Sequence, residues 1–223
     1  YQSDIPDDPG GGTVDWTNPW GEYKYVDDIE SREDGGTPGF LQAIRTALAI
    51  MLKEKMGITQ MMQREEELVE IAMTGLRKIP GIKIMAGSSE HRLGIISFFH
   101  KDIHFNLIVK LLSDRFGIQV RGGCACAGTY GHFLLEVSYD RSHRITEMIS
   151  HGDLSEKPGW VRVSLHPVIT GDEVQYFLES LKEIVSNHME WKKDYIYNRK
   201  KNEFEHNSVT DNSNIWIQEW FNL

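Results

Sequence analysis

The sequence has little cysteine and no long hydrophobic run. Its 223 residues include two cysteines, too few for a disulfide framework, so a reducing cytoplasm is the simplest compartment. A membrane-spanning helix needs about 18 consecutive apolar residues, and the longest apolar stretch, residues 47–52, is far shorter. No signal peptide is visible. We therefore expect a folded cytoplasmic protein with no membrane partner. Because the chain begins at Tyr1, it is expected to be a processed product or a fragment.

Basic residues are also in the minority. The chain has 24 Lys and Arg against 33 Asp and Glu, which gives a formal net charge of −9. Phosphate binding needs a clustered basic excess, so a nucleic-acid partner is not expected. The densest basic run lies within residues 192–201 among acidic residues, and it predicts a solvated helix. With 40% hydrophobic residues, the chain can bury one substantial core or two small ones.

The order of patterns along the chain predicts an α+β fold. Residues 1–39 are rich in Asp, Gly and Pro and favour loop, with a possible strand only at 23–26. Apolar residues then recur at helical spacing over 40–56 and 61–76. Further along the chain, short apolar stretches typical of strands alternate with two more helical stretches. The predicted strands are 82–85, 93–99, 118–120 and 160–165, and the helices are 105–116 and the stretch from Thr170, where Glu173 completes a capping box. This order of elements predicts a small sheet with helices packed on it.

Both cysteines lie in the stretch "VRGGCACAG", residues 120–128. Cys124 and Cys126 could ligate a metal ion or form a disulfide. Alternatively, one of them could be a catalytic nucleophile and the other could have no part in the reaction. With His132 they could hold a soft metal, but a closed zinc site needs four ligands, and no second Cys or His pair has the usual spacing, so no metal is expected. A disulfide would close a very tight ring, which would be strained and therefore regulatory if it forms at all.

Four motifs carry a family resemblance. "GIQVRGGCACAG", followed by "GWVRVSLHPVITGDEVQYFLESLKEI", resembles the C-terminal region of class V aminotransferase-type enzymes of fold type I, which use pyridoxal 5'-phosphate (PLP). This group contains the cysteine desulfurases and selenocysteine lyases. Upstream, "GGGTV" resembles the family's glycine turn, and "EDGGTPGFLQAIRTAL" resembles its E-x-GTP segment. The resemblance covers roughly residues 10–190.

The resemblance implies a domain plan and a missing part. Residues 1–39 correspond to an active-site loop segment from the end of the large PLP domain, 40–190 to the small C-terminal α/β domain, and 191–223 to a charged helical tail outside the family. PLP needs a Schiff-base lysine and an acidic partner for its pyridinium nitrogen, and the family places both in a large domain that precedes this chain. Lys101, in "FFHKDIH", falls between a strand and a helix and is not expected to be that lysine. The fragment alone is therefore expected to be inactive.

The resemblance also assigns binding residues. Arg162 is expected to bind the carboxylate of a small amino-acid substrate through two parallel hydrogen bonds and so fix its orientation. An ordinary ion pair at the end of a strand is the alternative. Arg121 and His166 are expected nearby, with a structural salt bridge and a packed or capping histidine as the alternatives. Gly12 and Thr13 are candidate contacts to the cofactor phosphate of the partner subunit in a homodimer. The alternative is an ordinary connecting loop.

Cys126 aligns with the family's sulfur-accepting nucleophile. That thiolate attacks the sulfur of PLP-bound cysteine and leaves as a persulfide, which a sulfur-acceptor protein can take over. An inert loop thiol is the alternative. Cys124 stands where one desulfurase branch has a histidine, and Gly-Cys-x-Cys looks more like the molybdenum-cofactor sulfurase branch. Residues 133–159 form an insertion with a predicted helix at 141–149, which could reshape access to the cleft.

The predicted function is C–S bond cleavage of the cysteine desulfurase or selenocysteine lyase type, through a persulfide. One alternative is another class V PLP enzyme: an aminotransferase, a molybdenum-cofactor sulfurase-like enzyme or an epimerase. The other is a non-catalytic dimerisation or partner-binding domain.

Overall fold

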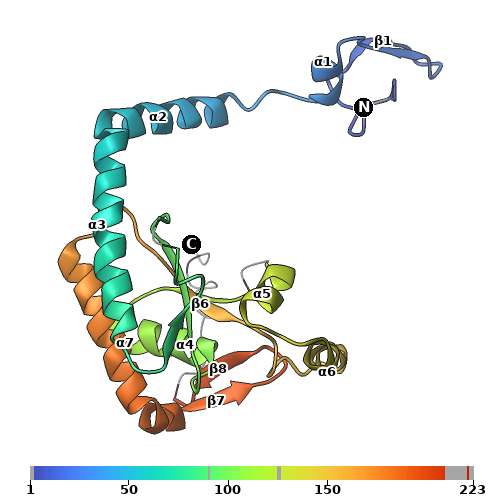
Figure 1. The fold of residues 1–223 in the computed structure, drawn as a ribbon. Helices are drawn as coiled ribbons and strands as arrows, with labels where there is room; N and C mark the ends of the chain where they lie inside the picture. Colours follow the sequence, from blue (N-terminus) through green and yellow to red (C-terminus); the bar gives the residue numbers. More distant parts are fainter. Residues whose placement is uncertain (1–2, 90, 125–126, 209–219, 221–223) are drawn as a thin grey trace. The chain divides into compact units, whose positions relative to one another are not determined.

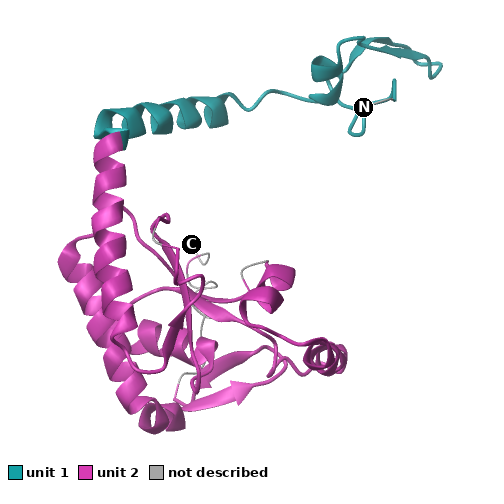
Figure 2. Ribbon diagram, viewed as in Figure 1, with its two compact units in different colours: residues 1–58 teal, residues 59–223 magenta. Residues whose placement is uncertain are grey.

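The computed structural model describes residues 3–89, 91–124, 127–208 and 220 (Figure 1). The chain forms two compact units, residues 1–58 and 59–223 (Figure 2). The domain boundaries expected after residues 39 and 190 stay predictions. Within the described ranges, every helix is too short or too polar to cross a membrane.

The first unit is a small hairpin with two helices. Its strands pair antiparallel, and Asp28 caps the first helix by accepting a hydrogen bond from the Ser31 N–H at 2.9 Å. The elements are β1 (Val14–Thr17), β2 (Tyr23–Tyr25), α1 (Ile29–Glu33) and α2 (Phe40–Met56). Sequence reasoning placed only β2 and α2. It missed β1 and α1 because both are short and mostly exposed, so neither carries a hydrophobic period.

The second unit is built on a four-stranded antiparallel sheet in the order β3-β4-β6-β5. Its strands are β3 (Ile82–Ile84), β4 (Ile95–His100), β5 (Arg121–Gly123) and β6 (Trp160–Ser164). Three strands lie where the sequence predicts them, whereas the one expected at 118–120 lies at 121–123. The reason is that the Ile118 N–H donates to the Leu112 carbonyl at 2.9 Å, closing the preceding helix around the left-handed Gly117.

Helices cover one face of this sheet. They are α3 (Ile58–Arg77), α4 (Phe105–Phe116) and α7 (Gly171–Trp191). Strand residues that alternate along β4 and β6, such as Phe98 and Val161, are fully buried and join Leu112 and Leu181 in one core. The predicted capping box is confirmed, because the Glu173 N–H donates to Thr170 Oγ1 at 3.2 Å and the Thr170 N–H donates to Glu173 Oε2 at 2.7 Å. The expected α+β fold, helices on a small antiparallel sheet, is confirmed.

Two helices follow the cysteine loop, α5 (Gly128–Leu134) and α6 (Tyr139–Ser150), and α6 lies within the insertion. The helix predicted at 141–149 is confirmed within α6. Sequence reasoning missed α5, which packs against the sheet: a Cβ added to Gly131 would lie 2.8 Å from the Trp160 ring. Its glycine therefore permits close approach to β6.

The charged tail, residues 191–223, was predicted to be helical, and for residues 195–206 that prediction is wrong. After a short turn, η1 (Lys192–Asp194), the chain forms an antiparallel hairpin of β7 (Tyr195–Asn198) and β8 (Glu203–His206). Tyr195 and Phe204 are buried against the core, whereas Ile196 is exposed. This alternation is typical of a strand, and the surrounding lysines and glutamates obscure it in the sequence.

Candidate active site

Three polar side chains stand in one row across the sheet. Ser97 on β4 is paired with Arg162 on β6, and Arg162 is paired with Arg121 on β5. Residues directly opposite on antiparallel strands project to the same face, with Cβ atoms about 5 Å apart. Gly122, the next residue along β5, faces α4, where an added Cβ would lie 2.5 Å from Asn106 Oδ1. The row Ser97–Arg162–Arg121 therefore occupies the face opposite α4.

The row concentrates positive charge. Both guanidinium groups are charged at any physiological pH, and like charges directly opposite each other on a sheet are destabilising. Arg162 is half-buried, and its Nε is a buried atom with no hydrogen-bond partner in the described part of the chain. A buried donor left unpaired costs about 1–3 kcal/mol. A planar anion such as a carboxylate, bound at Arg162, would satisfy this donor and relieve the repulsion.

The cysteine loop leaves the same sheet. It follows β5, and it begins at Gly123, whose φ of 112° lies in the region that favours glycine. Cys124 is partly buried with a free thiol, and its carbonyl accepts a hydrogen bond from the Ala127 N–H at 2.9 Å. Cys126, the predicted nucleophile, lies outside the described residues. Among the residues described, no three His, Cys, Asp or Glu side chains converge as metal ligands would.

His166 lies beyond the end of β6 and is exposed. Its Nδ1 accepts a hydrogen bond from the Val168 N–H at 3.3 Å, and its carbonyl accepts one from the Ile169 N–H at 2.8 Å. These bonds are those of a residue that caps a local turn. They match the alternative interpretation of His166, and within the described residues no hydrogen bond joins it to Arg162.

The glycine turn belongs to the first unit. Gly12 has a φ of 89°, and Thr13 is fully buried, with its hydroxyl donating to the Gly10 carbonyl at 2.7 Å. The Gly11 carbonyl accepts a hydrogen bond from the Gly36 N–H at 2.7 Å, which ties the two glycine-rich segments together. The Thr13 hydroxyl is thus engaged within its own turn. The exposed backbone of Gly11 and Gly12 is the part of the turn that is open to an anion.

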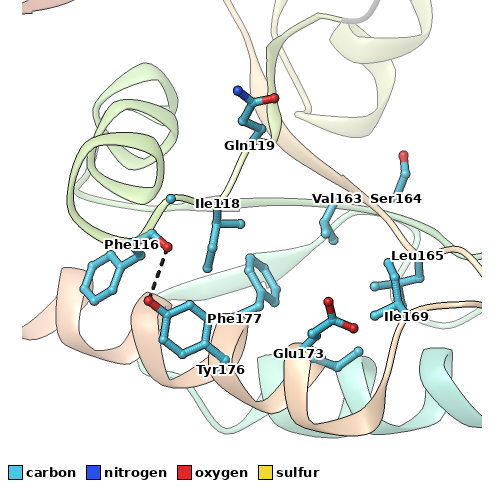
Figure 3. A pocket seen from close by; sticks show the side chains of 12 residues that line it. Phe116, Ile118, Gln119, Val163, Ser164, Leu165, Ile169, Glu173, Tyr176 and Phe177 are labelled. Carbon is cyan, nitrogen blue, oxygen red and sulfur yellow. Dashed lines mark hydrogen bonds between the residues drawn. The ribbon is translucent and has the colours of Figure 1, made fainter.

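Sequence reasoning missed Ser97 as a member of the row. The signal was a serine flanked by apolar residues on both sides in the strand "IISFFH". A separate apolar cavity of about 340 Å³ lies where the end of α4 meets β6 and α7 (Figure 3). Ile118, Val163 and Phe177 line it, and Tyr176 Oη donates to the Phe116 carbonyl at 3.2 Å at its edge. No residue of the row lines this cavity, so it is not part of the candidate site.

Comparisons with known proteins agree with one another. A family model described as Aminotransferase class-V matches residues 3–177. A probable cysteine desulfurase of Staphylococcus epidermidis is 32% identical over 118 residues, covering 53% of this chain and 28% of the relative. One of Staphylococcus aureus is 30% identical over the same length and with the same coverage. The chain therefore spans less than a third of the length of these curated relatives.

Solved structures show the same fold. The apo structure of a cysteine desulfurase from Thermococcus onnurineus NA1 superposes with a TM-score of 0.57 at 27% identity, covering 82% of this chain and 40% of that one. A cysteine desulfurase from Escherichia coli also superposes with a TM-score of 0.57, at 18% identity and with 81% and 39% coverage.

Proposed function

The chain belongs to the class V aminotransferase family, and we propose that it supplies the substrate-binding face of a PLP-dependent enzyme that cleaves the C–S bond of a small amino acid. The observation that carries this proposal is the pair of guanidinium groups on one face of the sheet, with a buried Arg162 Nε that lacks a partner among the described residues. An α-carboxylate is the planar anion that such a group binds through two parallel hydrogen bonds.

In the proposed role, Arg162 fixes the substrate's orientation. A carboxylate gripped at two points cannot rotate, so the scissile bond is held in one direction, and such positioning is a large part of catalysis. Arg121 adds positive charge at the same register, and the Ser97 hydroxyl is a further polar group in the row. None of these groups gives up or takes up a proton in this role.

The residues present fit PLP in one respect. The exposed backbone at Gly11 and Gly12, with the left-handed conformation of Gly12, suits a phosphate group. When bound, PLP supplies the electron sink that such bond cleavage requires. The lysine that anchors it is expected outside this chain. The proposal further includes a homodimer in which the exposed backbone at Gly12 approaches the partner's cofactor phosphate, while the buried Thr13 holds the turn in shape.

We assign sulfur acceptance to Cys126, on its place in the family's motif. Support from the fold is that the loop carrying it leaves β5 directly after Arg121, Gly122 and Gly123. A protein acceptor for the persulfide sulfur and a cytoplasmic location complete the proposal.

The test is an assay of the full-length protein with PLP, measuring alanine and sulfide released from cysteine. We expect Arg162→Lys to lower kcat/KM about 100-fold, because an ammonium keeps the charge but loses the two-point grip. Arg115→Lys is the matched control, since Arg115 pairs with Asp194 at 3.0 Å outside the row, and its kcat/KM should stay within about twofold of the parent. Unchanged activity in Arg162→Lys would overturn the assigned role.

The same assay tests the cysteine. Cys126→Ala should abolish alanine release, while Cys124→Ala should retain it. If Cys126→Ala releases alanine at the parent rate, the nucleophile assignment fails and the PLP assignment stands. An intact protein that does not bind PLP would contradict both.

A further inference from the structure

A cavity of about 370 Å³ lies beside Cys124, at the free edge of β5. Its walls come from β5, the start of α4, the loop before β6 and the turn between β7 and β8. The last of these walls belongs to a hairpin that follows the region matched by the family model, which ends at residue 177. Of the row Ser97–Arg162–Arg121, Arg121 lines this cavity, whereas Ser97 and Arg162 do not. The cavity therefore adjoins the candidate active site, and its other lining residues lie outside the row.

The hairpin turn is fixed in place by buried polar contacts. Asn202 is 7% exposed and adopts a φ of 58°. Its Oδ1 accepts a hydrogen bond from Tyr197 Oη at 2.7 Å, and its carbonyl accepts one from Asn106 Nδ2 of α4. The Lys201 N–H donates to Asn198 Oδ1 at 3.2 Å. The backbone that carries Lys201 is therefore held rigidly against α4.

The loop before β6 is tied to the same hairpin. The Leu154 N–H donates to the Arg199 carbonyl at 3.0 Å, and the Arg199 guanidinium contacts the Asp153 carboxylate at 3.2 Å. Lys157 follows three residues after Leu154 and lines the cavity. These contacts bring two lysines that are far apart in the sequence to one cavity.

The cavity is locally positive in a strongly acidic chain. Arg121, Lys157 and Lys201 line it together with one acid, Glu203. Lys201 also pairs with Glu205 at 3.1 Å. The chain as a whole has a net charge of −9, so three cations in one concavity focus a field that attracts anions. The volume falls within the range of small-molecule sites.

We propose that this cavity binds a small organic anion through its carboxylate group, with the other end of the ligand against the Cys124 thiol, and that Lys157 and Lys201 select it. Ammonium groups on flexible stems suit a carboxylate whose position varies from ligand to ligand. The C-terminal hairpin is thereby a specificity element, and it lies beyond the region matched by the family model.

The alkylation rate of the Cys124 thiol can be used to test whether the cavity attracts anions. In a Cys126→Ala variant of the chain, Cys124 is the sole thiol. The probes are iodoacetate and its neutral analogue iodoacetamide, each of which loses iodide as the thiolate sulfur bonds to its CH₂ carbon. For each thiol, the measured quantity is the rate constant with iodoacetate divided by that with iodoacetamide. This ratio should be at least about fivefold higher for Cys124 than for free 2-mercaptoethanol. Lys157→Gln and Lys201→Gln should each lower it at least about twofold, and together they should bring it to that of the free thiol.

Two further measurements complete the test. Lys193→Gln is the matched control, because it removes the same charge from an exposed lysine of η1 that does not line the cavity, and its ratio should equal that of the parent. Succinate should slow alkylation by both reagents in the parent and not in the double lysine variant. A parent ratio equal to that of the free thiol, an equal fall in Lys193→Gln, or no protection by succinate would each overturn the proposal.

Discussion

The helices α2 and α3 follow each other in the chain and have opposite environments. Both have apolar residues at helical spacing, yet α3 buries five residues and α2 buries none. The partners of α3 lie in the second unit: a Cβ added to Gly75 would come within 2.2 Å of Leu178 on α7. On α2, Leu48 is 59% exposed and Met51 is 63% exposed. Periodicity therefore predicts a helix and its apolar face, but it does not say whether the chain itself covers that face. Exposed apolar patches are typical of interaction surfaces.

The largest expected effect contrasts two leucines. Leu112 on α4 is fully buried in the second unit, and Leu48 lies exposed on α2. Leu112→Ala should lower the free energy of unfolding by about 2–5 kcal/mol, because it removes buried methyl groups and leaves a cavity. Leu48→Ala should change it by less than about 0.5 kcal/mol. Urea unfolding followed by circular dichroism measures both. Similar losses in the two variants would break the contrast between the helices.

The second expected effect is a pH dependence located in the second unit. Residues 1–58 contain no histidine. In the second unit, the His104 ring stacks on Phe105 at 4.5 Å and lies beneath the hairpin, 5.3 Å from the Tyr197 ring. Burial, followed by the charge of Lys192, lowers the pKa of His104 from 6.5 to about 4.

The sign follows from proton binding. Between pH 6.5 and about 4 the unfolded chain binds a proton at His104 that the folded chain does not, so stability falls as pH falls through this window. With the ring partly exposed, the loss should be about 2 kcal/mol. His104→Asn keeps an acceptor at the N-cap of α4, where His104 Nδ1 accepts from the Asn106 N–H at 3.1 Å, and removes the titration. The difference in unfolding free energy between parent and variant, measured at pH 7 and pH 4.5, isolates this residue. A difference that does not change with pH would contradict the prediction.

Local signals explain what the sequence could predict. The capping box at Thr170, the helical spacing of α4 and the short apolar stretches of β4 and β6 are each encoded within a few residues, and each was placed correctly. Arg162 was assigned from the family resemblance. The hairpin of β7 and β8 was missed because its few apolar residues stand among charges.

No local sequence pattern indicates the contacts between distant segments that build the site. Ser97 and Arg121 join Arg162 only through strand pairing, and the order of strands in a sheet is not written in any one strand. Lys157 and Lys201 meet at the cavity beside Cys124 because Asn106 and Arg199 tie the hairpin to α4 and to the loop before β6. Such contacts depend on the whole fold, so a pattern within one segment cannot reveal them.

The smallest expected effect on stability tests α2 directly. Ile44, Leu48 and Met51 lie on one face of the helix at spacings of four and three, and all are more than half exposed. Changing the three to Gln should leave the free energy of unfolding within about 0.5 kcal/mol of the parent. It should also reduce concentration-dependent self-association, measured by sedimentation velocity, because it removes an exposed apolar patch. A loss of stability as large as that of Leu112→Ala would mean that this face is covered within the chain, and the contrast between α2 and α3 would then fail.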